Sequence, residues 1–317
     1  MYKKVVVFGG GTGISYLLKG LKDFPMDITA VITVSDNGRS TGKLRKEFHT
    51  PAVGDIRNVI TNLSQIDEPI KQMMAYRFHT SSDLDGHAVG NLILTAMLDI
   101  TGSLKESIKH LSKLLDVRHT VLPISEDSDL TIMGETEDGE IIEGEAQITS
   151  DPHHMRRIFY KNEPKVSPEV ISAIKEADLI VFSMGSLYTS ILPNIICKEV
   201  QEAFNEAKAP IMYICNIVTQ PGETDKFTVG DHVKLINNHL NNRKLDVVIA
   251  NKTKIDKKIA KRYETKERKD PVPIDYDEIA KMDIELIDAN LMTIDEDTLK
   301  HDGLKLGSIV FSYLMRD

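Results

Sequence analysis

Glycines and a threonine follow the first apolar run of the chain, at a place where they could bind an anion. The run is Lys3 to Phe8, and the residues after it are Gly9, Gly10, Gly11, Thr12 and Gly13. Glycine lets a backbone approach an anion closely, and the helix expected next would present free N–H groups to a phosphate. The spacing is neither that of the dinucleotide fingerprint nor that of a P-loop. A tight turn without a ligand is the alternative.

A second polar group follows the apolar run Ile28 to Val34. It consists of Ser35, Asp36, Asn37, Gly38, Arg39, Ser40, Thr41, Gly42 and Lys43. Asp36 lies near the position where dinucleotide-binding chains carry the acid that accepts from ribose hydroxyls. Arg39 and Ser40 would suit a second phosphate, because a guanidinium binds phosphate oxygens in pairs. The alternative is a turn in which Asp36 bonds to its own backbone.

Two shorter stretches place polar residues beside predicted helices. In the first, Asp55, Arg57 and Asn58 are candidate ligand contacts, although Asp55 could cap a helix or pair with Arg57. In the second, His87 and Asn91 are four residues apart and would share one helix face. A polar face toward the ligand and a structural histidine are both open. No cysteine or HExxH motif accompanies His87, so a metal site is not expected.

The later loops repeat this pattern of strand, small residues and helix. Gly185 and Ser186 would form a second anion-binding turn, and two such turns suit a diphosphate. The other candidates are side chains able to hydrogen-bond a base or sugar. They are Tyr188, Asn216, Thr219, Gln220 and Asn251. An ordinary turn at Pro221-Gly222 explains part of this stretch. No residue has the surroundings of a nucleophile, because Ser186 is not in a GxSxG motif.

Short apolar runs alternate with helical patterns along most of the chain, which predicts a sheet that positions these loops. The expected strands are 3–8, 28–34, 179–182, 211–215 and 245–250, with helices near 14–21, 168–177, after 193, 231–240 and 304–314. This alternation predicts an α/β fold, a Rossmann-like, doubly wound parallel sheet in three layers. In such sheets the loops after the strands meet at one edge, where ligands bind.

Three segments depart from this alternation. Residues 55–116 have helical periodicity, including a helix over 84–100, and 118–150 is predicted to be a small β-rich insertion, with an alternating segment at 140–148. Residues 252–285 are expected to be less regular. Within them, 252–269 carries nine basic and three acidic residues, either a solvated face or an arm that closes over an anionic ligand. We expect a single domain over 1–317.

The composition limits the class of protein. The chain has 317 residues, 41% of them apolar, and a formal net charge of −9, so nonspecific binding to nucleic acid is not expected. Cys197 and Cys215 lie in apolar surroundings without metal-site spacing, as core thiols of a reducing compartment do. The start of the chain lacks the pattern of a signal peptide, and no run suits a membrane span. We therefore expect a cytoplasmic protein without membrane insertion.

Six blocks in this order resemble the CofD-like family, and most closely its bacterial branch, the YvcK-type gluconeogenesis factors. The blocks are VVVFGGGTGIS, SDNGRSTGKLR, GDIRN, GHAVGNLIL, GSLYTSILPN and CNIVTQPGETD. The resemblance implies a Rossmann-like fold and binding of UDP-sugars such as UDP-N-acetylglucosamine, with no required cofactor. It also implies a role in growth on gluconeogenic carbon sources and in cell shape, with cell-wall synthesis proteins or a second copy of the chain as partners.

The other branch of the family implies an alternative function. Its 2-phospho-L-lactate transferases move a phospho-acid group from a nucleotide-diphosphate donor to a deazaflavin with magnesium. Asp36 would then bind Mg²⁺ and His87 would position the acceptor. Those enzymes carry an Asp-Asp pair where this chain has Asp36-Asn37, and a single carboxylate weakens a magnesium site. A third hypothesis, an NAD(P)-binding protein, rests on the first glycine group and Asp36.

Overall fold

A central sheet of seven parallel strands organises the protein. The structure is a computed structural model that describes residues 2–151, 153–295 and 298–316. The sheet order is β10-β9-β8-β7-β1-β2-β3, and every neighbouring pair is parallel. The strands are β1 Lys3–Gly9, β2 Met26–Ile32, β3 Thr120–Pro123, β7 Leu179–Phe182, β8 Ile211–Ile214, β9 Val247–Asn251 and β10 Glu285–Ala289.

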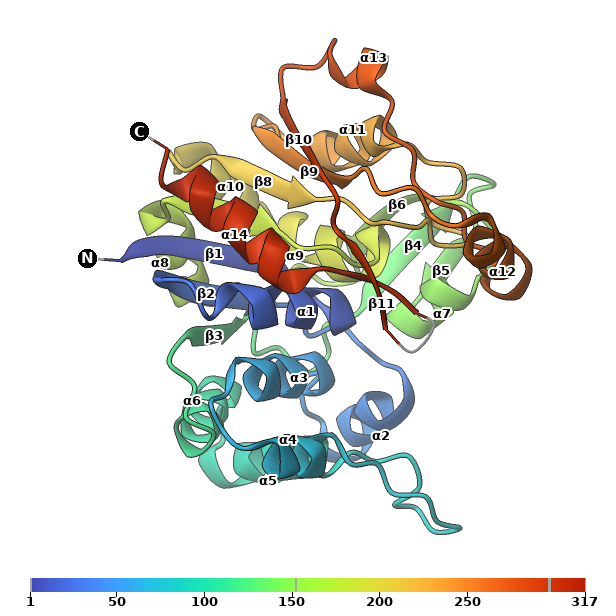
Figure 1. Cartoon of the computed structure of the whole chain (residues 1–317). Helices are drawn as coiled ribbons and strands as arrows, with labels where there is room; N and C mark the ends of the chain where they lie inside the picture. The colour runs from blue at the N-terminus through green and yellow to red at the C-terminus, as the bar shows by residue number, and fades with distance from the viewer. Residues whose placement is uncertain (1, 152, 296–297, 317) are drawn as a thin grey trace.

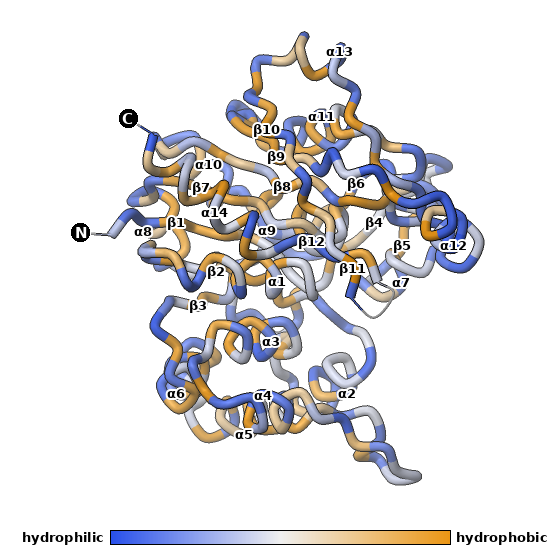
Figure 2. The backbone as a smooth tube through the Cα atoms, in the orientation of Figure 1, coloured by the Kyte–Doolittle hydropathy of each residue, from blue (hydrophilic) through white to orange (hydrophobic). Residues whose placement is uncertain are grey.

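Helices cover both faces of this sheet, which confirms the Rossmann-like prediction. The chain builds outward from β1 to β3 and then from β7 to β10, so right-handed connections place the helices of the two halves on opposite faces. Figure 1 shows α1 Gly11–Leu21 and α14 Gly303–Leu314 in front of the sheet, with α8 Pro168–Glu176 and α10 Lys198–Glu206 behind it. Figure 2 shows the central strands as apolar runs. Such runs are expected where both faces of a strand are buried, as they are here.

Five helices lie beyond the β3 edge of the sheet (Figure 1). They are α2 Arg39–Phe48, α3 Gly54–Leu63, α4 Glu68–Ala75, α5 Val89–Thr101 and α6 Leu104–Leu114. The prediction of a helical segment is confirmed, but two details were wrong. The second polar group is a loop only as far as Gly38, since α2 begins at Arg39. The helix expected from 84 begins at Val89, because the backbone at 86–89 bonds to residues 76–84 instead of forming a helical turn.

A small antiparallel sheet of order β5-β4-β6 follows. Its elements are β4 Ile132–Thr136, β5 Ile141–Glu143 and β6 Met155–Tyr160, with α7 Glu145–Ser150 between β5 and β6. The predicted insertion 118–150 was therefore misplaced. Its first strand, β3, pairs with β2 in the central sheet, and the small sheet needs β6, which lies beyond residue 150. Residues 145–148 are helical, because Gly144 has a positive φ of 98° that ends the strand.

The segment 252–285 is more regular than predicted. It contains α12 Lys257–Glu267 and α13 Tyr276–Ile279. Asp256 caps the start of α12 by accepting a hydrogen bond from the Lys258 N–H, and Tyr263 is the side chain of this helix that is buried. Figure 2 shows the rest of α12 as largely hydrophilic. The sequence patterns also missed β10 and the hairpin of β11 Met292–Asp295 with β12 Thr298–His301.

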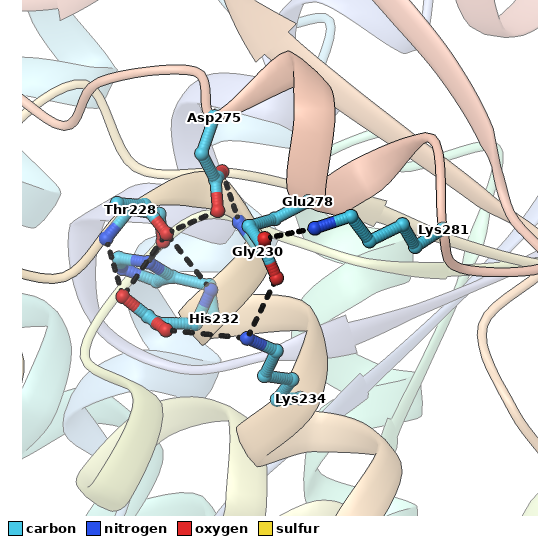
Figure 3. Close-up of polar contacts among 8 residues, drawn as sticks. Thr228, Gly230, His232, Lys234, Asp275, Glu278 and Lys281 are labelled. Atoms are coloured by element: carbon cyan, nitrogen blue, oxygen red, sulfur yellow. Dashed lines mark hydrogen bonds and ion pairs between the residues drawn. The ribbon is translucent and has the colours of Figure 1, made fainter.

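A polar cluster fastens α13 to α11 Val229–His239 (Figure 3). Thr228 and Asp231 form a capping box at the start of α11. Asp275, at the start of α13, accepts from the Thr228 hydroxyl at 2.8 Å and from the Gly230 N–H at 2.8 Å. These bonds satisfy N–H groups that a helix start leaves unpaired, so they hold the segment after α12 against the central sheet.

The single-domain prediction for 1–317 stays a prediction.

The contact between α1 and α14 depends on a glycine. A Cβ added at Gly20 would lie 1.9 Å from the carbonyl oxygen of Gly303, a backbone atom that cannot move aside cheaply. Helix propensity alone would favour Gly20→Ala by about 1 kcal/mol, but overpacking should reverse the sign and lower the free energy of unfolding by about 1–3 kcal/mol. Urea denaturation measures this change. The exposed neighbour variant Lys19→Ala should stay within about 0.5 kcal/mol, and a stabilised Gly20→Ala would contradict the packing.

Candidate functional site

A cavity of about 310 Å³ lies where the strand order reverses, between β1 and β7. Ligands of open α/β sheets bind at this point, because the loops after two neighbouring strands turn to opposite faces and leave a crevice. Nine predicted site residues line the cavity: Gly10, Gly11, Thr12, Gly13, Gly185, Ser186, Asn216, Thr219 and Gln220. The structure thus brings the two glycine-containing loops together with the loop after β8.

Gly13 allows the two glycine loops to approach each other. A Cβ at Gly13 would lie 2.0 Å from the Met184 carbonyl oxygen, so no other residue fits there without moving the backbone. Gly11 has a φ of 62°, a conformation that glycine adopts without strain. These constraints explain why glycines are found at this turn, whether or not an anion binds.

Asp55 occupies part of the first anion-binding turn. Its Oδ2 accepts a hydrogen bond from the Gly11 N–H at 2.5 Å. The expected roles for Asp55 as a cap of its own helix or a partner of Arg57 were wrong: α3 begins at Gly54 with Val53 as its cap, and the described residues contain no Asp55–Arg57 ion pair. The carboxylate thus joins α3 to the start of α1. Thr12 and Gly13 lie in the first turn of α1, where a helix leaves its N–H groups without an intrahelical partner.

The second anion-binding turn is held together by a side chain predicted to contact a ligand. The Asn216 side chain accepts from the Gly185 N–H at 2.9 Å and donates to the Gly185 carbonyl at 2.7 Å. Both of its polar atoms are therefore used inside the protein, and the Gly185 N–H is not free for an anion. The Ser186 hydroxyl donates to Glu223 at 2.5 Å and accepts from the Thr189 N–H.

Three more predicted ligand contacts serve the backbone. The Tyr188 hydroxyl donates to the Met155 carbonyl at 2.8 Å, which ties the turn to the small sheet. The Thr219 hydroxyl oxygen accepts from the Asp270 N–H at 2.9 Å. Asn251 bonds to the backbone of Thr253 and accepts from the Leu291 N–H at 3.0 Å. Of these three, only Thr219 lines the cavity.

The second polar group lies apart from the cavity lining. The Asp36 side chain accepts from the Gly38 N–H at 2.8 Å, the turn that was the alternative to ribose binding. Asn37 accepts from the Ala146 N–H and donates to Gln147, so it joins this loop to α7. Arg39 is exposed, with no partner among the described residues. Arg45, which the sequence did not single out, donates to four backbone carbonyls and holds the loop in place.

His87, Asn91, Ser40 and Arg57 form a buried network among the helices. The prediction that His87 and Asn91 share one helix face was wrong, because His87 precedes α5. The Ser40 hydroxyl connects them, 3.0 Å from His87 Nδ1 and 3.3 Å from Asn91 Nδ2, while Arg57 Nε donates to Asn91 Oδ1 at 3.0 Å. Burial lowers the pKa of Arg57 to about 10. Asn58 lies in a separate hollow between α1, α3 and α4.

Buried carboxylates next to the glycine loops are a feature that the sequence did not indicate. Burial raises the pKa of Asp55 to about 6 and that of Glu223 to about 7, and it raises the pKa of Glu145 well above its usual value. Repulsion from Asp36, Asp55 and Glu223 adds to the shift of Glu145. These groups come from loops and helices far apart in sequence, so no spacing motif could reveal them.

The described residues do not fit a metal ion. No three of their histidine, cysteine, aspartate or glutamate side chains converge closely enough to hold one. The magnesium that the resemblance implies therefore has no group of three such ligands among the described residues. Cys197 and Cys215 are both buried free thiols, as expected.

Seven lining residues were not predicted as site residues: Met184, Ser190, Ile217, Val218, Lys269, Leu299 and His301. Lys269 belongs to the basic stretch, for which an arm over an anionic ligand was one hypothesis. Its ammonium lines the cavity and pairs with the exposed Glu267 carboxylate at 2.8 Å. Leu299 and His301 lie on β12, a strand that no sequence pattern indicated. The backbone N–H of Leu299 donates to the Tyr263 hydroxyl at 2.7 Å, which joins this strand to α12.

The family model for the 2-phospho-L-lactate transferase CofD matches residues 5–292. The chain belongs to the CofD family. It is 42% identical over 312 residues to a gluconeogenesis factor of Bacillus subtilis, covering 98% of each chain. It is 39% identical to a putative gluconeogenesis factor of Thermotoga maritima, covering 97% of this chain and 98% of that one. A crystal structure of a Bacillus halodurans protein matches with a TM-score of 0.95 and 39% identity, over 98% of this chain and all of the other.

This membership agrees with the resemblance inferred from the six blocks. Relatives named gluconeogenesis factor match over nearly the whole chain, at about the same length. Among the described residues there is no helix with the length and apolar character that a bilayer span requires.

The raised pKa of Glu223 predicts a pH dependence of stability. Between pH 4.5, its ordinary pKa, and pH 7 the folded CofD-family chain keeps a proton that the unfolded chain has lost, so stability should fall as the pH rises through this range. Glu223→Gln should reduce that slope and raise the free energy of unfolding at pH 8 by on the order of 1–2 kcal/mol. Urea denaturation across the range measures both. The exposed variant Glu47→Gln should leave the curve unchanged, and parallel curves for wild type and Glu223→Gln would contradict the assignment.

Proposed function

We propose that this protein is a gluconeogenesis factor that binds a nucleotide-diphosphate sugar, such as UDP-N-acetylglucosamine, in the cavity between β1 and β7. The observation that carries the proposal is the composition of the cavity lining. Glycine-loop N–H groups and Lys269 can meet a diphosphate, whereas Gln220 and apolar side chains surround the rest of the cavity.

The cavity offers binding groups without a nucleophile. Burial raises the pKa of Cys215 to about 12, so its thiol is not ionised at neutral pH. Ser186 already donates its proton to Glu223, and none of the histidines among the described residues bonds to it. A site that binds without reacting suits a regulator that senses its ligand.

The names of the relatives support the gluconeogenic part of the proposed physiological role. Proteins named gluconeogenesis factor match over almost the entire chain. We therefore propose a role in growth on gluconeogenic carbon sources. We also propose that the protein is cytoplasmic, that it affects cell shape through cell-wall synthesis proteins, and that it self-associates. Deletion of the gene should impair growth on a gluconeogenic carbon source, and re-expression should restore it.

Lys269 gives the proposal a direct test. Calorimetry with UDP-N-acetylglucosamine should show saturable binding, and Lys269→Ala should weaken it by about tenfold to a hundredfold, because a charge-assisted contact to phosphate is lost. Lys266→Ala is the matched control, since Lys266 is exposed near the end of α12, close to Lys269 in the chain, and does not line the cavity. Absence of saturable binding by the wild-type protein would rule out the proposed function.

The second candidate function is that of a phospho-acid transferase. It is favoured by the description of the matching family model. Incubation with a nucleotide-diphosphate-linked phospholactate, a deazaflavin acceptor and Mg²⁺ should give no product above the protein-free blank. Turnover that Asp36→Ala abolishes would instead establish the transferase. The NAD(P) hypothesis is tested in the same binding assay, where nicotinamide dinucleotides should not displace UDP-N-acetylglucosamine.

A further inference from the structure

His301 presents an unpaired hydrogen-bond acceptor at the cavity. Its Nε2 lies 3.1 Å from the Cys215 carbonyl oxygen, and a carbonyl can only accept, so Nε2 carries the ring proton. Burial lowers the pKa of His301 to about 4, which keeps the ring neutral at physiological pH. Its Nδ1 therefore has a free lone pair, and no donor among the described residues meets it.

Gln220 adds a second acceptor to the same lining. Its Oε1 is buried and has no hydrogen-bond partner among the described residues. The backbone of Gln220 is held in place, because its N–H donates to the Thr224 hydroxyl at 2.8 Å and its carbonyl accepts from the Glu223 and Thr224 N–H groups. A buried acceptor without a donor costs free energy, and a turn of the Gln220 side chain toward the cavity would let a ligand donor recover it.

The surroundings of His301 suit a flat ring better than a sugar. Ile217, Val218 and Leu299 line the cavity with it, and their apolar surfaces would leave sugar hydroxyls without partners. Asn216 and Thr219, the other predicted base contacts, already bond to Gly185 and Asp270. Recognition of the base is therefore left to His301 and Gln220.

We infer that His301 Nδ1 accepts a hydrogen bond from a ring N–H of the bound base, with Gln220 of the same cavity lining as a second acceptor, so that the cavity selects nucleotides whose base carries such a group. Uracil has this N–H at N3, whereas the N3 of cytosine is bare. His301 is a specificity-determining residue in this arrangement, and its fixed tautomer is the physical basis. The inference rests on the proposed nucleotide binding.

Calorimetry with UDP, N3-methyl-UDP and CDP tests the inference. The wild-type protein should bind UDP about tenfold more tightly than N3-methyl-UDP or CDP, because methylation or the cytosine ring removes the donor. His301→Gln should abolish this preference: its amide can still donate to the Cys215 carbonyl but no longer offers the Nδ1 acceptor. His301→Asn should restore part of the preference, since its amide oxygen can stand near the position of Nδ1. The thermal midpoint of each variant checks its fold.

The outcomes separate the two levels of inference. Equal affinity of the wild-type protein for UDP and N3-methyl-UDP, or an unchanged preference in folded His301→Gln, would overturn the role of His301 and leave nucleotide binding in place. Binding of none of the three nucleotides by the wild-type protein would overturn both. If His301→Gln does not fold, the comparison of UDP with N3-methyl-UDP on the wild-type protein still decides the matter.

Discussion

The close approach of the loops after β1 and β7 is the constraint on which the rest of the site depends. The Met184 carbonyl lies where a side chain of residue 13 would begin, so the two backbones meet with no space for a Cβ. This contact brings the start of α1 next to Gly185 and the Asn216 side chain that holds it. Strand pairing between β1 and β7 sets the distance, and the loop after β8 and strand β12 then close the cavity around it.

The electrostatics of the site differ from those of a simple phosphate-binding turn. Asp55 bonds to the Gly11 N–H, and other buried carboxylates lie nearby with raised pKa values. A phosphate at this turn would compete with Asp55 for the Gly11 N–H. Protonation of Asp55 near pH 6 would reduce the repulsion between its carboxylate and the phosphate. Lys269 is the cation that lines the cavity. The net charge of −9 therefore does not forbid an anionic ligand, because the proposed binding would depend on N–H groups and one local cation.

Sequence periodicity predicted most of the central sheet and the helices that follow its strands. It failed where local patterns compete with long-range contacts. Residues 145–148 alternate like a strand, yet Gly144 turns the chain into α7. Strand β10 was missed because Glu285 and Asp288 interrupt its short apolar run at the sheet edge, and β12 because its four residues include Lys300 and His301. Nine of the predicted site residues line the cavity, whereas Asp36, Arg57 and Asn251 are used elsewhere in the fold.

The sequence alone determined the fold class, the family and the edge of the sheet at which the glycine loops meet, because these depend on local patterns of apolar residues and glycines. Only the tertiary structure decided which polar atoms remain available to a ligand. Asn216 and Thr219 hydrogen-bond to the backbone of neighbouring loops, whereas Lys269 and His301 belong to segments far away in the sequence and line the cavity. Hydrogen-bond satisfaction is a property of the folded neighbourhood, so residue type and spacing cannot settle it.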